Sequence, residues 1–189
     1  MNDQAPLFPL IGALRDLVLW LADARTEGVV IGGVASSILG RPRMTRDVDL
    51  LVLVEDSDWV AFLNHAGNHG IEPRRQDVLE FARRSRVLLL RHLPTDINVD
   101  AVLGLIPFER QVIQRANVVR LAGVRVPLPT PEDMIIMKLV ARRPQDLDDV
   151  RGIIAANTDL DLDYIRRITS QFATELDVPD MVRDLDELL

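Results

Sequence analysis

The sequence predicts an α+β protein in which a mixed sheet with flanking helices is followed by a helical C-terminal portion. Strand-like apolar runs alternate with helical patterns as far as residue 129, whereas only helical patterns follow from Thr130 onward. The chain has 189 residues, of which 48% are hydrophobic, so it can bury a sizeable core. We therefore expect a sheet-containing core over residues 1–129 and a helical portion over residues 130–189 packed on that core.

Hydrophobic periodicity and helix-stop residues define the first elements of the chain. Gly28 ends a run of apolar residues at three- and four-residue spacing, and Gly32 and Gly33 end a short β-branched run. The expected elements are helices over residues 9–27 and 34–39 and strands over residues 29–31 and 47–54.

The middle of the chain alternates short helices with two pairs of strands. Leu93, Pro94 and Thr95 separate the strands of one pair, and a turn at Ala122 and Gly123 separates those of the other. The expected helices cover residues 59–67, 77–84 and 108–116, and the expected antiparallel hairpins cover residues 87–90 with 97–103 and 118–121 with 124–128.

The C-terminal portion begins with a strong helix-start signal. Thr130 is a typical N-cap residue, Pro131 suits the first helical position, and two acidic residues follow in the first turn. The expected helices cover residues 134–142, a segment that restarts near Asp146, and residues 161–173 and 178–189.

Composition excludes several classes of protein. The absence of cysteine removes disulfide frameworks, thiolate catalysis and cysteine-ligated zinc. A net charge of -7 argues against nonspecific coating of nucleic acid, but residues 74–91 carry six arginines against two acidic residues. This basic stretch leaves specific contact with RNA open. The sequence shows no secretory signal and no apolar stretch long enough to span a bilayer, so we expect a cytoplasmic protein.

A pair of carboxylates begins the clearest strand. Asp47 and Asp49 are separated by one residue, so both side chains leave the same face at the same edge of the sheet. Adjacent carboxylates repel each other, and a divalent metal relieves that repulsion. The alternative is that one aspartate caps the loop while the other is solvated.

Two further segments accompany this pair. Gly32 and Gly33 lie between a strand and a helix, where backbone N–H groups bind phosphate, and the hydroxyls of Ser36 and Ser37 follow in the first turn. A close-packed turn would also explain the glycines. This segment is a candidate phosphate loop.

The strand of residues 97–103 and the turn before it supply a third carboxylate. Asp96, Asn98 and Asp100 recur at period two and are expected on one face. Either aspartate would complete a metal shell or accept a proton from an acceptor hydroxyl, with Asp100 the better candidate because apolar residues follow it. The alternative is a solvent-facing hairpin.

Together these segments resemble a known superfamily. Residues 31–54 (IGGVASSILGRPRMTRDVDLLVLV) look like the signature of the nucleotidyltransferase superfamily, whose fold is shared with DNA polymerase β. Residues 132–149 (EDMIIMKLVARRPQDLDD) resemble the lysine and closing acidic motifs of its AbiEii/AbiGii toxin branch. The resemblance implies that residues 1–129 are a nucleotidyltransferase catalytic core.

The resemblance also implies roles for individual residues. Asp47, Asp49 and Asp100 would be the catalytic metal ligands, with Asp100 also the base, for Mg²⁺ in a two-metal site that Mn²⁺ can also fill. The residues implied to bind the nucleotide are Gly32, Gly33, Ser36, Ser37, Arg46, Lys138, Asp146 and Asp149.

Lys138 is the single lysine among 22 basic residues, and it falls where the superfamily needs a compact ammonium on a triphosphate. A surface lysine is the alternative there, and a capped helix start is the alternative for Asp146 and Asp149. Two departures weaken the match: Gly33 stands where many relatives have serine, and Gln145 stands where the branch often has arginine.

The resemblance implies Mg²⁺-dependent transfer of a nucleoside monophosphate from ATP or another NTP to an acceptor hydroxyl. For the toxin branch the acceptor is RNA, notably the tRNA 3′ end, and the toxin pairs with a cognate antitoxin. Arg41, Arg43, Arg46 and the basic stretch 74–91 favour RNA. The alternatives are a small-molecule nucleotidyltransferase of the aminoglycoside type and a catalytically silent nucleotide-binding subunit.

Overall fold

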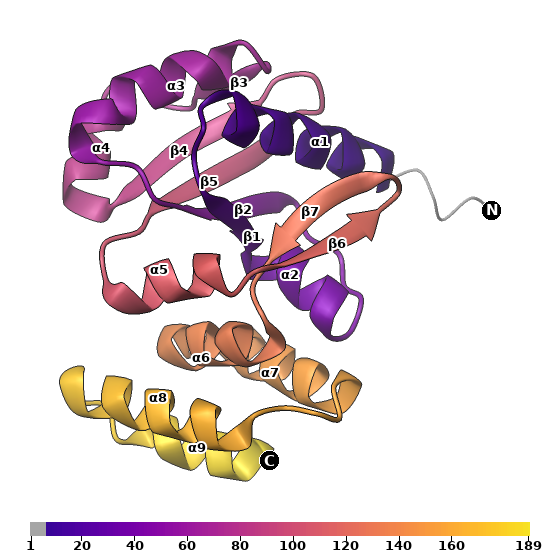
Figure 1. Cartoon of the computed structure of the whole chain (residues 1–189), viewed down its shortest axis with the longest axis vertical. Coiled ribbons are helices and arrows are strands. Elements are labelled where there is room, and N and C mark those ends of the chain that lie inside the picture. Colours follow the sequence, from indigo (N-terminus) through magenta and orange to yellow (C-terminus); the bar gives the residue numbers. More distant parts are fainter. Residues whose placement is uncertain (1–6) are drawn as a thin grey trace. The chain divides into compact units, whose positions relative to one another are not determined.

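The computed structural model describes residues 7–189, and the chain divides into two compact units (Figure 1). The first unit comprises Met1–Gly32 and Thr45–Leu128, and the second comprises Gly33–Met44 and Pro129–Leu189. The longer segment of the second unit begins at Pro129, next to the division between residues 129 and 130 that the sequence suggested. The unit also contains residues 33–44 from the N-terminal part of the chain.

The first unit is built on a five-stranded mixed sheet of order β1-β2-β5-β4-β3. Its strands are β1 (Gly28–Ile31), β2 (Asp47–Val52), β3 (Ile71–Pro73), β4 (Val87–His92) and β5 (Ile97–Leu103). Only β2 and β5 run parallel, and the other neighbours are antiparallel. The predicted hairpin of β4 and β5 is confirmed. The strand β3 was not predicted, because three residues are too few for a periodic pattern.

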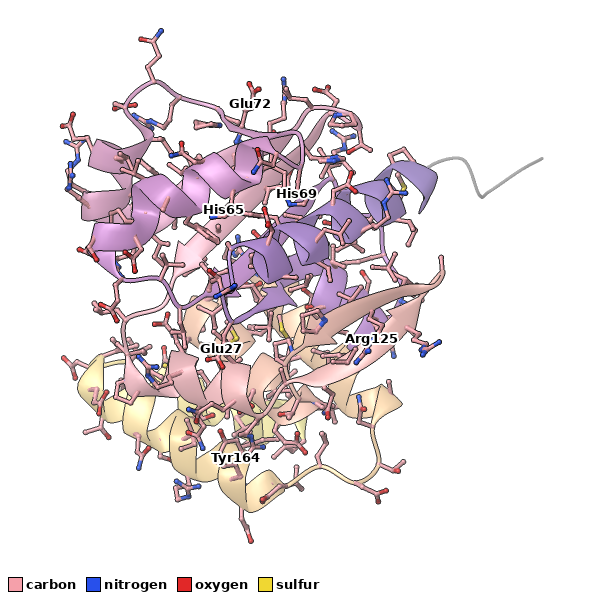
Figure 2. All side chains as sticks on the ribbon, turned by 45° about the horizontal axis from the view of Figure 1, so that its top comes forward. Glu27, His65, His69, Glu72, Arg125 and Tyr164 are labelled. Carbon is pink, nitrogen blue, oxygen red and sulfur yellow. The ribbon has the colours of Figure 1, made fainter. Side chains whose placement is uncertain are left out.

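Most other elements of the first unit agree with the periodicity to within a few residues. They are α1 (Leu7–Asp23), α3 (Trp59–Gly67), α4 (Val78–Ser85), α5 (Pro107–Gln114) and the hairpin of β6 (Asn117–Leu121) with β7 (Val124–Leu128), whereas the short helix η1 (Asp56–Asp58) was not predicted. Trp20 of α1 stacks on Phe62 of α3 with ring centroids 4.3 Å apart, and its indole N–H donates to the Phe62 carbonyl. Nearby, His65 of α3 and His69, which follows α3, approach the Asp23 carboxylate at 3.0 and 3.5 Å (Figure 2). These contacts fix α1 against α3.

Alternation along β2 explains why one face of the sheet carries polar groups. Val48, Leu50 and Val52 are fully buried, so this face of the strand belongs to the core. The side chains of Asp47 and Asp49 leave the opposite face, where Leu51 is the buried apolar residue. Each added strand in register extends both faces, so polar residues of β5 join the aspartates.

The second unit consists of helices. They are α2 (Gly32–Leu39), whose first residue belongs to the first unit, α6 (Pro131–Ala141), α7 (Pro144–Ala156), α8 (Leu162–Glu175) and α9 (Asp180–Leu188). The hydroxyl of Thr130 accepts from the Asp133 amide at 3.2 Å, which confirms the predicted N-cap of α6. The phenol of Tyr164 (Figure 2) donates to the Asp133 carboxylate at 2.6 Å and ties α8 to α6.

Close packing explains why the segment of residues 33–44 groups with these helices. A Cβ atom on Gly40 would lie 2.8 Å from the backbone nitrogen of Ile153, so only glycine allows this approach to α7. The Asn157 amide also donates to the Leu39 carbonyl at 2.9 Å. Among the helices of residues 7–189, none is long and apolar enough to cross a membrane.

Candidate active site

The strand register brings three of the predicted carboxylates to one face of the sheet, on the neighbouring strands β2 and β5. In the parallel pair β2–β5, Asp49 lies directly opposite Asp100, and Asp47 lies opposite Asn98. Register partners project from the same face. This face therefore presents two aspartates from the sequence motif and a third from a strand about 50 residues further along.

The register extends these pairs into two rows that cross the sheet. One row joins Asp49, Asp100 and Leu89, and the other joins Asp47, Asn98, Arg91 and Glu72. We call this surface the carboxylate face and define it by these residues together with Arg74, which follows β3.

Two polar side chains contact the carboxylates directly. The Asn98 amide donates to Asp47 at 3.1 Å, and the Arg74 guanidinium donates to Asp100. Burial raises the pKa of Asp100 above its usual value; the Arg74 charge opposes that rise, and the nearby Asp47 charge adds to it. A cation close to Asp100 therefore favours the charged form of its carboxyl.

Gly32 allows the Asp49 carboxylate to take its position. This glycine has φ of +64°, and an added Cβ atom would lie 1.8 Å from Oδ2 of Asp49. Any other residue would clash with the carboxylate and strain the backbone. The close-packed turn, which was one of two explanations offered by the sequence, therefore accounts for Gly32. A phosphate loop at this position stays a prediction.

The structure separates Asp96 from Asp100. Asp96 lies in the turn before β5 with φ of +58°, its side chain is 78% exposed, and it pairs with Arg91 at 3.2 Å. Asp100 lies within β5, opposite Asp49. Asp100 is therefore the aspartate of this segment that joins the carboxylate face.

The donor chemistry of the carboxylate face suits a hard divalent cation. Asp47, Asp49 and Asp100 offer carboxylate oxygens, the ligands that Mg²⁺ and Mn²⁺ prefer. Within residues 7–189, however, no group of three or more His, Cys, Asp or Glu side chains is drawn together as a metal site. The residues fit the ion by type and position, and their side chains are held by Asn98 and Arg74.

The predicted lysine lies in a second cluster, within the second unit. Lys138 of α6 is only 4% exposed, and its ammonium lies 2.8 Å from Asp146 and 2.8 Å from Asp149 of α7. Arg43 adds a bidentate pair to Asp149 at 2.8 and 2.9 Å, and Arg143 pairs with Asp146 at 2.6 Å. We call these five residues the lysine cluster.

The lysine cluster decides some of the alternatives that the sequence left open. Lys138 is buried, so it is not a surface lysine. Asp146 caps α7, because its carboxylate accepts from the Arg143 backbone amide at 3.1 Å. Burial acts to raise the pKa of Asp146, but the hydrogen bonds from Arg143 and Lys138 hold it below its usual value. The pKa of Asp149 is likewise lowered, against its burial, by the hydrogen bonds from Arg43 and Lys138.

The remaining predicted nucleotide contacts lie on or near α2. Ser36 is buried, and the Ser37 hydroxyl donates to the carbonyls of Gly33 and Arg43 at 2.9 and 3.1 Å. Ser37 therefore supports the loop that carries Arg43, whereas Arg46 is exposed. Nucleotide contact by these residues stays a prediction.

Reasoning from sequence named Arg43 and Arg74 as basic residues but missed their ion pairs. Arg74 meets Asp100 across 26 positions, and Arg43 meets Asp149 across 106. No local spacing signals either pair. The strand β3 places Arg74 beside β4. Prediction of β3 would have been needed to find the pair of Arg74 with Asp100.

The basic stretch 74–91 is largely neutralised within the protein. The ion pairs are Arg74–Asp100, Arg75–Asp77, Arg84–Glu80, Arg86–Asp56 and Arg91–Asp96. Positive charge in the sequence therefore overstates the positive charge that this surface offers to RNA.

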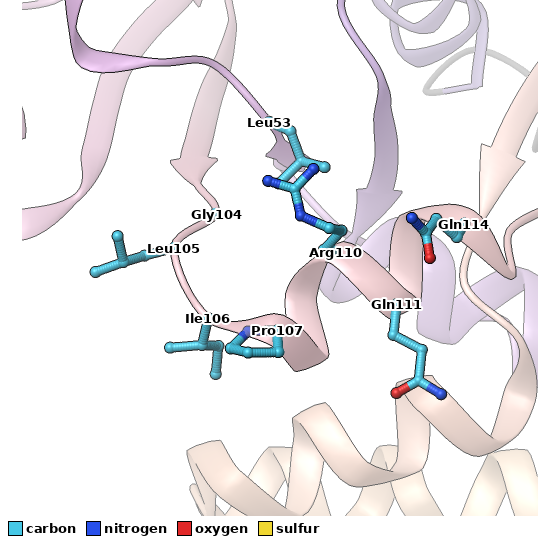
Figure 3. Close-up of a pocket in the computed structure, with 8 residues that line it drawn as sticks. All are labelled: Leu53, Gly104, Leu105, Ile106, Pro107, Arg110, Gln111 and Gln114. Carbon is cyan, nitrogen blue, oxygen red and sulfur yellow. The ribbon is translucent and has the colours of Figure 1, made fainter.

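A cavity of about 220 Å³ lies at the other end of the strands (Figure 3). It is lined by Leu53 and Gly104, which follow β2 and β5, and by Arg110 and other residues of α5. Asp47 begins β2, so this cavity is remote from the carboxylate face.

Three solved structures are similar to this chain, and one of them is described as nucleotidyltransferase-like. The antibiotic-resistance factor ANT(2'')-Ia matches with a TM-score of 0.61 at 12% identity, over 95% of this chain and 97% of that one. An antigenic nucleotidyltransferase-like protein from Paracoccidioides brasiliensis matches with a TM-score of 0.56 at 16% identity, over 92% of each chain. JHP933 from Helicobacter pylori matches with a TM-score of 0.50 at 14% identity, over 97% of this chain and 79% of that one. At such identities the likeness shows the nucleotidyltransferase fold alone.

The family follows from the sequence itself. A family model described as "Nucleotidyltransferase of unknown function (DUF6036)" matches residues 7–185, so this chain belongs to that family. It is therefore a transferase of the nucleotidyltransferase class, as the sequence predicted. A search of curated proteins gives no significant match.

Proposed function

We propose that this protein transfers a nucleoside monophosphate from an NTP to an acceptor hydroxyl with the help of a divalent cation, Mg²⁺ or Mn²⁺. One observation carries the proposal: the register places Asp49 beside Asp100 and keeps Asp47 on the same face. Membership of a nucleotidyltransferase family supports it.

In the proposed reaction, the acceptor oxygen forms a bond to the α-phosphorus while the bond from that phosphorus to the bridging oxygen breaks. Pyrophosphate leaves, and the Asp100 carboxylate takes the proton of the acceptor hydroxyl. Asp47, Asp49 and Asp100 would hold the metal, which when bound neutralises charge on the phosphates. Gly32 keeps Asp49 in position because no Cβ atom intervenes.

We propose RNA, in particular the tRNA 3′ end, as the acceptor, and a toxin role in the cytoplasm with a cognate antitoxin as partner. Arg41, Arg46 and Arg83 are exposed and provide charge for phosphate contacts. Because most arginines of the stretch 74–91 form ion pairs within the protein, fewer of them are available for RNA phosphates than the sequence suggests. The resemblance to the AbiEii/AbiGii toxin branch supports the toxin role.

Lys138 belongs to the proposal as the residue that contacts the triphosphate. Asp146 and Asp149 occupy two of the three N–H donors of its ammonium, so one donor remains for such contact, but the buried side chain must become accessible to make it. A change in the KM for NTP in Lys138→Arg, at unchanged thermal stability, would support that contact. A change in stability alone would leave Lys138 a structural residue.

The test is transfer of label from each α-labelled NTP in the presence of Mg²⁺ and total tRNA. We expect label on RNA with the wild type and none with Asp47→Asn or Asp49→Asn, whereas Asp159→Asn, which changes an exposed aspartate outside the site, stays active. Label on a supplied aminoglycoside but not on RNA would show that the acceptor is a small molecule and not RNA. Absence of transfer to any acceptor, with NTP still bound, would leave a silent binding subunit.

The toxin role needs its own experiment. Induced expression of the wild type should arrest growth, and the Asp49→Asn variant should not. Normal growth with active wild-type enzyme would remove the toxin role while leaving the transferase activity in place.

A further inference from the structure

Arg74 holds a defined position beside the carboxylate face. Its backbone amide donates to the carbonyl of Leu89 at 2.9 Å, and Leu89 lies opposite Asp100 in the β4–β5 register. The backbone of Arg74 is therefore bonded to β4, which lies between Arg74 and the strand β5 that carries Asp100. From there its guanidinium reaches across β4 and pairs with the Asp100 carboxylate.

This pair is more confined than the other ion pairs of the same stretch. The side chains of Arg74 and Asp100 are 29% and 33% exposed, whereas those of Arg84 and Glu80 are both 66% exposed. Ion pairs on an open surface contribute little, and partial burial strengthens the attraction between the charges. Arg74 is therefore placed to hold Asp100 in the absence of another cation.

The charge on the carboxylate face leaves room for a further cation. The face carries the carboxylates of Asp47, Asp49, Asp100 and Glu72 but only the guanidinium groups of Arg74 and Arg91. Arg91 also pairs with Asp96, and carboxylate oxygens gathered on one face are the ligands that a divalent cation prefers. While Arg74 pairs with Asp100, however, one of the three candidate ligands is occupied.

The surroundings of Arg74 also offer its side chain a second place. A hollow of about 390 Å³ is lined by Glu72, Pro73, Arg74, Arg91 and Leu93. Glu72 (Figure 2) supplies an acidic partner there, so a displaced guanidinium would still lie near a carboxylate. The side chain can thus leave Asp100 without movement of β3.

We propose that Arg74 is an exchangeable counter-ion of the metal site, which holds Asp100 until a divalent cation takes its place and then moves into the hollow beside Glu72. This inference rests on the proposed function, because it takes Asp47, Asp49 and Asp100 as metal ligands. Arg74 is a positioning residue that acts through Asp100. It sets the metal concentration at which the site assembles.

The test measures binding of Mn²⁺ and of Mg²⁺ by titration calorimetry, without nucleotide or acceptor. Arg74→Gln should bind the metal about fivefold more tightly than the wild type, which corresponds to the upper end of the energies of exposed ion pairs. Arg75→Gln is the matched control, because Arg75 is the next residue and pairs with Asp77 instead. Arg91→Gln removes a positive charge from the same face without touching Asp100, and it should change the affinity less than twofold.

A double-mutant cycle separates exchange from a general effect of charge. In an Asp100→Asn background, Arg74→Gln should no longer change the metal affinity. The inference is overturned if Arg74→Gln binds metal no more tightly than Arg75→Gln, or if the gain persists in the Asp100→Asn background. Failure of the proposed function would give a different result. The metal affinities of the variants would change as expected, but no nucleotide would be transferred to any acceptor.

Discussion

The carboxylate face and the lysine cluster contain similar residues but differ in how far their charges are compensated. On the carboxylate face, four carboxylates meet two arginines, and burial together with the Asp47 charge raises the pKa of Asp100 against the opposing charge of Arg74. In the lysine cluster, two aspartates meet three cations, and the pKa values of both aspartates are lowered.

The two regions therefore respond differently to the loss of one side chain. Carboxylates on a partly exposed face of the sheet repel one another, and an added cation relieves that repulsion. In the lysine cluster each buried aspartate pairs with Lys138 and with one arginine, so loss of the lysine weakens the compensation of both carboxylates. Substitutions in the two regions should therefore fail in opposite ways.

The largest expected effect is on the reaction at the carboxylate face. Asp49→Asn should lower kcat/KM for nucleotidyl transfer by about a thousandfold or more, because a metal ligand is lost. Its free energy of unfolding should change by less than about 1 kcal/mol, since the substitution removes like-charge repulsion. Steady-state kinetics and urea unfolding on one preparation check both parts, and a large loss of stability would contradict the contrast.

Gly32→Ala should also act on activity, through the position of Asp49. The added Cβ atom meets the Asp49 carboxylate, so we expect about a hundredfold loss of transfer from misplacement of that group. Gly123→Ala is the matched control, because Gly123 has φ of +87° but nothing within 4 Å of the added atom. Backbone strain lowers the melting temperature of both variants, and equal activity in the two would show that the contact with Asp49 does not matter.

Lys138→Met should break the lysine cluster by loss of stability. The free energy of unfolding should fall by about 3 kcal/mol, because two buried aspartates lose their shared partner while each keeps one arginine. The comparison is Arg151→Met, which removes an exposed pair with Asp148 and should cost less than about 1 kcal/mol. Urea unfolding curves of the two variants decide the point, and similar midpoints would contradict a structural role for the cluster.

Acid should weaken the lysine cluster by a smaller amount. The folded-state pKa values of Asp146 and Asp149 lie below their usual value of 3.8, so their contribution to stability is present above that value and is lost as the pH falls below it. Unfolding free energies of the wild type should therefore drop below about pH 4, and those of an Asp149→Asn variant should drop less steeply. Parallel slopes for the two proteins would exclude this origin of the acid sensitivity.

Local patterns predicted most of the fold and part of the site. The alternation after Asp47 and Asp49 predicted a buried strand with two carboxylates on one face, and Thr130 predicted the start of α6. The spacing of Asp96 and Asp100 left two candidates for the third carboxylate. The start of β5 at Ile97 was predicted correctly, but only the structure shows that Asp96 has a positive φ and pairs with Arg91, whereas Asp100 lies opposite Asp49.

Partners that are distant in sequence lay outside such patterns. Arg74 was recognisable as one arginine of a basic stretch, but its pairing with Asp100 depends on β3, a strand too short to predict. Lys138 was singled out by composition, whereas its burial between Asp146 and Asp149 depends on how α6 packs against α7. The same packing excludes the alternative of a surface lysine.

The sequence by itself therefore determined most of the helices and strands apart from β3, and the faces of β2, because each depends on residues close together in the chain. It also determined the membership of a nucleotidyltransferase family, through a match over residues 7–185. Only the tertiary structure decided which charges neutralise one another. Electrostatic pairing depends on distance and burial in space. For that reason Asp49 and Asp149, which are both aspartates of acidic motifs, have different surroundings. Asp49 lies on the carboxylate face, whereas Asp149 is buried between Lys138 and Arg43.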